Sequence, residues 1–313
     1  MCQLNWTKSH GNPLPQMTCE IVLNEDSSYS AGDLVSGEVI FNASKSFYTW
    51  AVRVALEGCA VVKLGQGPAQ MKSETFMDVG ENIFGKGEKI AFPAGEKKFK
   101  FSLNLSPLNG ELPGTMKNSY GFILYQVIIY MKQELRTFKQ AEKVITVGSF
   151  YSLSHQGKGI FAPVVCENLG KSPSMLQFLG IGSSKGSSDR LGVTFRMNRS
   201  GYVRGEEIPF QLDFKNGSNQ LISSALVCLL QKTVYSVGTT QKVLLVELHR
   251  VERKEISGDE TKWIQKLVCP EENVCPSQSG IIDVSYSVTI NVSVAGKEEP
   301  YILETPIKIG TIK

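Results

Sequence analysis

The chain has 313 residues, which is enough for two domains of ordinary size that each bury a core. Its 33 basic and 30 acidic residues leave a net charge of only +3. This balance excludes a dedicated nucleic-acid-binding protein, which usually carries a basic excess on one face. The seven cysteines form no C-x-x-C pair, and their odd number makes a poor disulfide framework, so we expect reduced and mostly buried thiols.

Residues 1–17 contain two prolines and no hydrophobic periodicity, which predicts a flexible N-terminal arm. The arm lacks the apolar core that a secretory signal needs, and no later apolar run approaches the length of a membrane span. We therefore expect a cytoplasmic protein.

Residues 18–150 predict a first domain built from β-strands. Apolar and polar residues alternate in several short segments separated by turn signals, which is the pattern of half-buried strands. These segments are 18–23, 34–41, 50–62, 99–105, 122–131 and 144–147. No apolar period of 3.6 residues persists for the roughly ten residues that a helix needs. The pattern predicts a β-sandwich.

Residues 65–96 are rich in Gly, Lys and Glu and predict a long hairpin or exposed connections. A group of lysines begins near the end of this segment and continues into the next strand. Its members are Lys86, Lys89, Lys97, Lys98 and Lys100. Acidic residues lie among them, so two interpretations stay open. The group is either a solvated hairpin face or a docking patch for an anionic partner, such as phosphorylated tails or acidic lipid.

Residues 151–190 are the least regular part of the chain and are rich in Ser and Gly, which predicts an interdomain linker. Residues 191–313 then predict a second β-rich domain. Its expected strands are 191–197, 208–214, 225–230, 243–251, 281–294 and 301–309. The chain is thus divided into an arm, a first sandwich, a linker and a second sandwich.

The two halves share landmarks. One set has the same spacing between the halves and consists of Tyr29, Gly32 and Asp33 in the first and Tyr202, Gly205 and Glu206 in the second. A second pair of segments, 144–150 and 306–312, closes each half. A duplicated domain leaves such a pattern. Because each glycine follows a tyrosine and precedes an acid, we predict structural turns with a left-handed residue ahead of a strand.

Two short motifs suggest catalysis but lack its structural context. Residues 182–186 match G-x-S-x-G, yet their flanks are a Ser/Gly-rich linker and a strand, whereas a nucleophile elbow needs a strand and then a helix. Residues 80–87 approach a P-loop but lack the Ser or Thr that holds magnesium and a following helix. The three histidines are too dispersed for a local metal site. We expect no enzyme and no catalytic, cofactor-binding or metal-binding residues.

The ordered landmarks resemble those of the α-arrestins, the arrestin domain-containing proteins. In the first half they are Tyr29-x-x-Gly32-Asp33, Gly37, Gly58, Leu112-Pro113 and Tyr120-Gly121-x-x-x-Tyr125. In the second half they are Tyr202-x-x-Gly205-Glu206, Asn216-x-Ser218, Gln231, Trp263, Tyr286 and Pro306-Ile307-x-Ile309-Gly310. The resemblance spans residues 18–312. It implies an all-β fold of two tandem immunoglobulin-like β-sandwich domains, with the arrestin fold, joined by a linker.

The resemblance also implies a non-enzymatic cytoplasmic adaptor, peripherally associated with the plasma membrane or endosomes. Such adaptors bind the cytoplasmic tails of membrane proteins in endocytosis, protein transport and endosomal sorting, and an anionic membrane surface is a further expected partner. Many members recruit ubiquitin ligases through Pro-Pro-x-Tyr. This sequence contains no such motif, its nearest approach being Pro300-Tyr301, so direct recruitment of that kind is not expected. The alternative function is a scaffold subunit of a retromer-like sorting coat.

Overall fold

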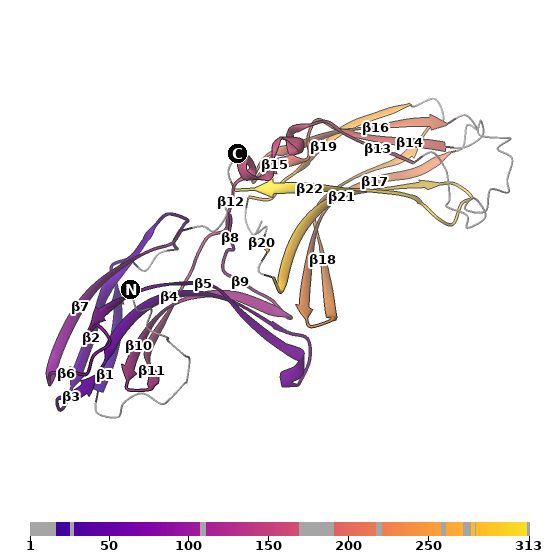
Figure 1. Ribbon diagram of the computed structural model, residues 1–313. Helices are drawn as coiled ribbons and strands as arrows, with labels where there is room; N and C mark the ends of the chain where they lie inside the picture. Colours follow the sequence, from indigo (N-terminus) through magenta and orange to yellow (C-terminus); the bar gives the residue numbers. More distant parts are fainter. Residues whose placement is uncertain are drawn as a thin grey trace. The chain divides into compact units, whose positions relative to one another are not determined.

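The computed structural model describes residues 17–25, 28–106, 111–168, 191–216, 221–257, 261–271, 277–278 and 280–311 (Figure 1). Its regular structure is almost entirely β-strand, and the described helices are three short 3-10 turns. The predicted all-β class is confirmed. The chain forms two compact units. Unit 1 takes in residues 1–150, 235–242 and 277–283, and unit 2 takes in the remainder.

One layer of unit 1 is an antiparallel sheet in the order β1-β2-β7. Its strands are β1 (Met17–Leu23), β2 (Leu34–Ala43) and β7 (Gly95–Asn104). Alternate residues of β2, such as Val35, Val39 and Phe41, are fully buried, and Phe101 and Leu103 of β7 join them. The residues between them face outward, because successive side chains of a strand point to opposite faces. The alternation predicted from the sequence therefore sets which face forms the core.

The second layer of unit 1 has the order β11-β10-β4-β5, with β9 paired to β10. Its strands are β4 (Ala51–Lys63), β5 (Met71–Phe84), β9 (Met116–Lys117), β10 (Gly121–Gln133) and β11 (Arg136–Ile145). The central strands β4 and β10 are buried on much of both faces. Tyr125, Ile123 and Ile129 of β10 are among the largest fully buried side chains.

A small two-stranded sheet closes one end of unit 1. Its strands are β3 (Phe47–Thr49) and β6 (Ile90–Phe92). Phe92 is fully buried, and its ring centroid lies 5.4 Å from that of Phe41, 5.1 Å from that of Phe47 and 5.0 Å from that of Phe84. Ring pairs at such separations are favourable, and they join this end to both layers. The shorter elements of unit 1 are η1 (Pro68–Gln70), β8 (Glu111–Leu112) and β20 (Ser277–Gln278).

Unit 2 contains most of two further layers, in the orders β13-β14-β16-β19 and β15-β22-β21-β17-β18, while the residues of β17, β18 and β21 within 235–242 and 277–283 belong to unit 1. The first is made of β13 (Val164–Asn168), β14 (Leu191–Met197), β16 (Glu207–Asn216) and β19 (Lys262–Val268). The second is made of β15 (Gly201–Val203), β17 (Ile222–Val237), β18 (Thr240–Ile256), β21 (Ile282–Val294) and β22 (Tyr301–Gly310). Phe195, Phe214 and Tyr202 are among its largest fully buried side chains.

The prediction of a linker over residues 151–190 is wrong for its first part. Residues 164–168 form β13, which pairs with β14 from Val164↔Met197 to Asn168↔Val193. An edge strand needs only one partner and a short apolar run, so its signal is weak in a Ser/Gly-rich segment. The short elements before it are β12 (Phe150–Tyr151), η2 (Leu153–Gln156) and η3 (Lys158–Phe161).

Three features of the sequence analysis lie outside the described residues. They are the N-terminal arm up to residue 16, the rest of the predicted linker at 169–190, and the G-x-S-x-G match inside that linker.

Candidate functional site

The first predicted turn is held by its glycine and its acid. Gly32 has a φ of 93°, in the left-handed region that glycine adopts without strain. The Ser30 backbone N–H donates to the Asp33 carboxylate at 2.6 Å, and the Asp33 N–H donates to the Ser30 carbonyl at 3.1 Å. Tyr29 is buried and bridges Val147 in parallel. The turn therefore binds the segment that closes the same half of the chain.

The second turn repeats this arrangement. Gly205 has a φ of 74°, the Val203 N–H donates to the Glu206 carboxylate at 2.9 Å, and the Glu206 N–H donates to the Val203 carbonyl at 3.1 Å. Tyr202 is buried and pairs in parallel with Ile309. In each half, the turn thus lies against the closing segment of that half. The sequence predicted both landmarks but not this contact between them. The side chains of these turn residues stabilise the fold and do not form a binding site.

The five lysines do not form one surface. Lys97 points to the opposite face of β7 from Lys98 and Lys100, because residues alternate along a strand. Lys86 and Lys89 lie in the connection between β5 and β6. The predicted lysines therefore lie on two elements, and Lys97 does not share a face with Lys98 and Lys100.

Lys98 and Lys100 project from the outer face of the β1-β2-β7 sheet. They lie opposite Ile40 and Glu38 of β2. Lys98 also forms an ion pair with Glu96 at 3.5 Å. Both partners of this pair are more than half exposed, and exposed pairs contribute little to stability. A partner that replaces this ion pair would therefore cost the protein little stability.

A hollow of about 450 Å³ adjoins Lys100 and the outer edge of β7. It is lined by Asn24, Gly37, Glu38, Glu81, Lys100, Phe101 and Ser102. Among the described strands of this sheet, β7 pairs only with β2, so its other edge presents backbone groups outward. The Ser102 N–H on that edge donates to the Glu81 carboxylate at 3.3 Å. A side chain from β5 therefore covers one position of this strand edge, and β5 contacts β7.

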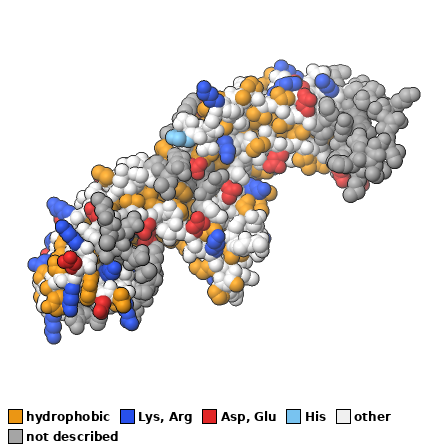
Figure 2. All heavy atoms as spheres, in the orientation of Figure 1, with side chains coloured by type: hydrophobic (Ala, Val, Ile, Leu, Met, Phe, Trp, Pro, Cys, Tyr) orange, Lys and Arg blue, Asp and Glu red, His pale blue; other side chains and the backbone are white. Residues whose placement is uncertain are grey.

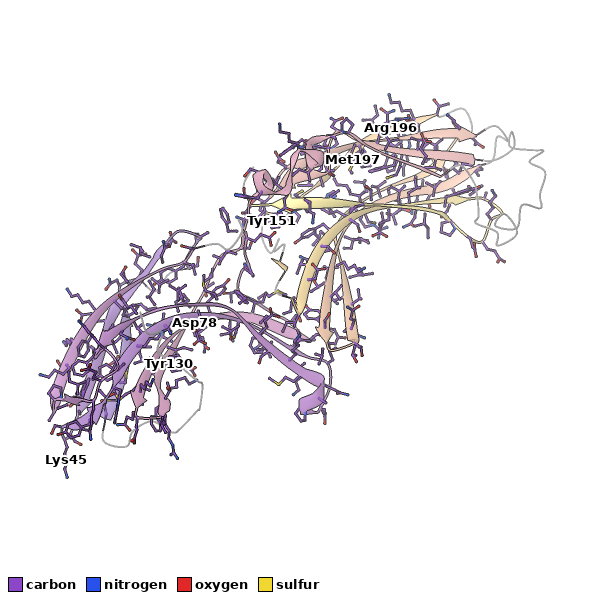
Figure 3. All side chains as sticks on the ribbon, viewed as in Figure 1. Lys45, Asp78, Tyr130, Tyr151, Arg196 and Met197 are labelled. Atoms are coloured by element: carbon purple, nitrogen blue, oxygen red, sulfur yellow. The ribbon has the colours of Figure 1, made fainter. Side chains whose placement is uncertain are left out.

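A polar cluster lies on neighbouring strands of the other layer. The Tyr130 hydroxyl donates to the buried Glu57 carboxylate at 2.8 Å, and Arg53 binds Asp78 at 2.7 Å. Burial raises the pKa of Tyr130 well above its ordinary value, and the hydrogen bond to Glu57 and the charges of Glu57 and Asp78 raise it further, while Arg53 opposes them. Figure 3 marks Asp78 and Tyr130 on this layer.

The cluster was missed from the sequence, although a signal was present. Arg53 and Glu57 are four residues apart in a strand, and an even spacing places both on one face. A glutamate within a run as apolar as β4 needs a buried partner. Gly80 leaves room for the arrangement, since a Cβ there would lie 2.7 Å from Arg53 Nε. The groups bind one another, which indicates a structural role.

The described cysteines are free thiols, two of them buried and three half-buried. Burial raises the pKa of Cys19 to about 12. Burial and then the charge of Glu206 raise the pKa of Cys269 to about 12, and burial and then Glu247 raise that of Cys228 to about 11. Since the thiolate is the reactive form, these three thiols are poor nucleophiles near neutral pH.

Within the described ranges, no three or more His, Cys, Asp or Glu side chains are grouped so that they could hold a metal ion. No helix of those ranges has the length and apolar character needed to cross a bilayer. The segment that approaches a P-loop runs along β5 and into the connection before β6, so a strand follows it.

Two family models match this architecture, one for each half. The model described as arrestin (or S-antigen), N-terminal domain, matches residues 19–154, and that for the C-terminal domain of arrestin matches residues 187–313. Together they account for most of the chain. The protein belongs to the arrestin family.

Curated relatives narrow the class to the α-arrestins. Human thioredoxin-interacting protein is 28% identical over 304 residues, covering 93% of this chain and 74% of the relative. The mouse protein of that name is 27% identical over 305 residues. Human arrestin domain-containing protein 4 is 24% identical over 301 residues, covering 91% of this chain and 68% of the relative. The resemblance predicted from the landmarks is confirmed.

Proposed function

We propose that this chain is a non-enzymatic adaptor that binds the cytoplasmic tails of membrane proteins and acts in endocytosis, protein transport and endosomal sorting. It would work in the cytoplasm, at the plasma membrane or on endosomes. The observation that carries the proposal is that matches to both arrestin domains cover most of the chain.

The outer edge of β7 is the site that we propose for a tail. In an antiparallel pair, alternate residues direct their backbone groups toward the partner strand. The Leu105 N–H donates to the carbonyl of Asp33, the residue before β2. The Ser102 N–H points away from β2 and donates to the Glu81 carboxylate. By this alternation, the N–H groups of Lys98 and Lys100 also point outward. An extended tail could add to this edge as a further strand, as many recognition domains allow.

The charges beside this edge indicate which tails would bind. Lys98 and Lys100 stand on the face next to the outward amides, so acidic or phosphorylated side chains spaced two apart on an added strand would lie opposite them. Glu81 would have to leave the Ser102 amide as the tail enters. Glu81 therefore covers the edge when no tail is bound and disfavours tails of low charge.

Peptide binding tests the proposal with the full chain and an array of acidic and phosphorylated tail peptides. The double variant Lys98→Glu/Lys100→Glu should bind the selected peptides about tenfold more weakly or worse. Lys100→Pro should do the same, because it removes an outward donor and leaves the bonds to β2 in place. Lys254→Glu, an exposed position on β18, is the control. Equal affinity of all four proteins would count against this site.

Three other roles are not part of the proposal. None of the relatives named above is a coat subunit, so we do not propose the scaffold alternative. A direct link to ubiquitination is also left out of the proposal, since the 313 residues contain no Pro-Pro-x-Tyr.

Some relatives are named for binding thioredoxin. The raised thiol pKa values of Cys19, Cys228 and Cys269 do not favour disulfide exchange as a route to such a partner.

A further inference from the structure

We propose that the end of unit 1 around strand β3 docks on the surface of an anionic lipid bilayer. This goes beyond the binding of tails and does not depend on it, because the β7 edge takes no part. We call this surface, made of residues 45–50, 85–90 and 132–136, the β3 tip.

The β10–β11 hairpin reaches β3 from one side. Lys132 O accepts hydrogen bonds from Thr49 Oγ1 and from the Trp50 N–H, both at 2.8 Å. The Gln133 amide donates to the Tyr48 carbonyl at 3.1 Å. These contacts fix the turn of the hairpin, residues 134 and 135, beside β3.

The connection between β5 and β6 reaches β3 from another side. The Gly87 N–H donates to the Trp50 carbonyl at 3.0 Å. Lys89 Nζ lies 4.7 Å from the centroid of the Tyr48 ring and 6.0 Å from that of Trp50, within reach of a cation–π contact. Three segments that are far apart in the sequence therefore form one surface.

Large apolar side chains are exposed on this surface. Leu135 is 90% exposed and Tyr48 59%. Leu135 sits in the two-residue turn between β10 and β11. Leu135 has the highest exposure of the large hydrophobic residues in the described part of the chain. Exposed apolar residues that gather in this way indicate a binding surface.

Basic side chains surround these apolar residues. They are Lys45, Lys86, Lys89, Lys132 and Arg136, against the acids Glu88 and Glu134. The chain as a whole is nearly neutral, so this excess is local. Figure 2 shows hydrophobic and basic side chains next to one another over this end of unit 1, and Figure 3 places Lys45 there.

A bilayer fits this combination better than an extended peptide. The apolar residues stand on separate turns and strands, and the hollow beside Lys100 is lined by other residues. A leucine and a tyrosine can enter the interfacial region together, because aromatic rings with a polar group favour that depth. Lysines around them would lie at anionic headgroups, where each contributes about fivefold to binding.

Co-sedimentation of the full chain with vesicles tests the proposal. Vesicles of phosphatidylcholine with about 30% phosphatidylserine should bind the chain, and vesicles of phosphatidylcholine alone should bind it far less. Raising the salt concentration should weaken the binding, because ions screen the lysines. No cargo peptide is present, so failure of the tail proposal would leave this result unchanged.

Variants separate the apolar from the charged contribution. Leu135→Asn should weaken binding about fivefold, because it loses its contact with the acyl chains, and Lys45→Glu/Lys89→Glu about tenfold or more, because it reverses the attraction to the headgroups. The matched controls Val144→Asn, at a 59% exposed position of β11, and Lys254→Glu should bind as the parent does. The thermal midpoint of each variant should match that of the parent, since the replaced side chains are exposed.

Insertion has a direct readout. Leu135→Trp should show a blue shift of emission on phosphatidylserine vesicles and quenching by brominated acyl chains. Absence of binding to these vesicles, or equal binding by Leu135→Asn and by Lys45→Glu/Lys89→Glu, overturns the proposal. If vesicle binding is unaffected in these variants and a protein partner is lost instead, the β3 tip is a protein-binding surface and the bilayer proposal is wrong.

Discussion

Gly32 and Asp33 maintain one turn by different means. The glycine adopts a left-handed backbone that costs other residues energy, and the carboxylate satisfies the Ser30 N–H. Because both requirements are local, both residues could be predicted from the sequence. The pairing of Glu57 with Tyr130 could not be predicted, since their hydrogen bond depends on the register between β4 and β10, which neither segment specifies alone.

Replacement of Gly32 tests the turn. Gly32→Ala should lower the free energy of unfolding by about 1 kcal/mol, because alanine is strained at positive φ. A Cβ at Gly32 would have no neighbour within 4 Å, so the cost is that of the backbone alone. Gly67→Ala is the matched control, as Gly67 has the same open space and a φ of −152°. Urea unfolding measures the free energy of unfolding of both variants. Equal losses in the two would contradict backbone strain at position 32.

Tyr130 should make stability depend on alkaline pH. Its pKa is raised on folding from the ordinary value of 10.0, so its contribution is fully present below pH 10 and is lost as the pH rises further. Tyr130→Phe should lower stability at pH 7 by about 1–2 kcal/mol, because Glu57 loses a buried donor. It should also flatten the decline above pH 10. Urea midpoints from pH 7 to 11 measure this, and parallel curves for parent and variant would exclude the role given to Tyr130.

Strands with one buried face were predicted well, including the edge strands β1 and β7, whereas β5 and β13 were not. The alternation in β2 and β16 follows from one face meeting the core, so the sequence carries it. β5 is an edge strand whose side chains are mostly exposed, and β13 is a short edge strand, so neither shows a clear period. The alternation of β7 was predicted, and it divides Lys97 from Lys98 and Lys100.

The close approach of β1 to β2 depends on Gly37. A Cβ at this position would overlap the Val22 carbonyl oxygen of β1. Gly37→Ala should therefore cost about 2–4 kcal/mol and speed amide exchange in β1. Gly192→Ala in β14 is the control, because its Cβ would make an ordinary contact 3.5 Å from Lys215. A cost below about 1 kcal/mol for Gly37→Ala would show that the two strands can move apart.

Duplication explains the chain as a whole. Each half places its turn against its own closing segment, through Tyr29 with Val147 in the first and Tyr202 with Ile309 in the second. This internal closure is why two ordered sets of landmarks predicted two sandwiches and the arrestin family. The copies differ in what they carry on the surface. The outer edge of β7 and the β3 tip both belong to unit 1, and we propose that function is concentrated there.

Hydrogen–deuterium exchange on the full chain, with and without an acidic phosphorylated tail peptide, tests the central claim most directly. If the tail adds to the outer edge of β7, the outward N–H groups of Lys98 and Lys100 become bonded, and that of Ser102 exchanges Glu81 for the tail. Exchange in the fragment that holds β7 should then slow when the peptide binds. Bound peptide with unchanged exchange in β7, and slower exchange at another strand edge such as β18, would contradict the account.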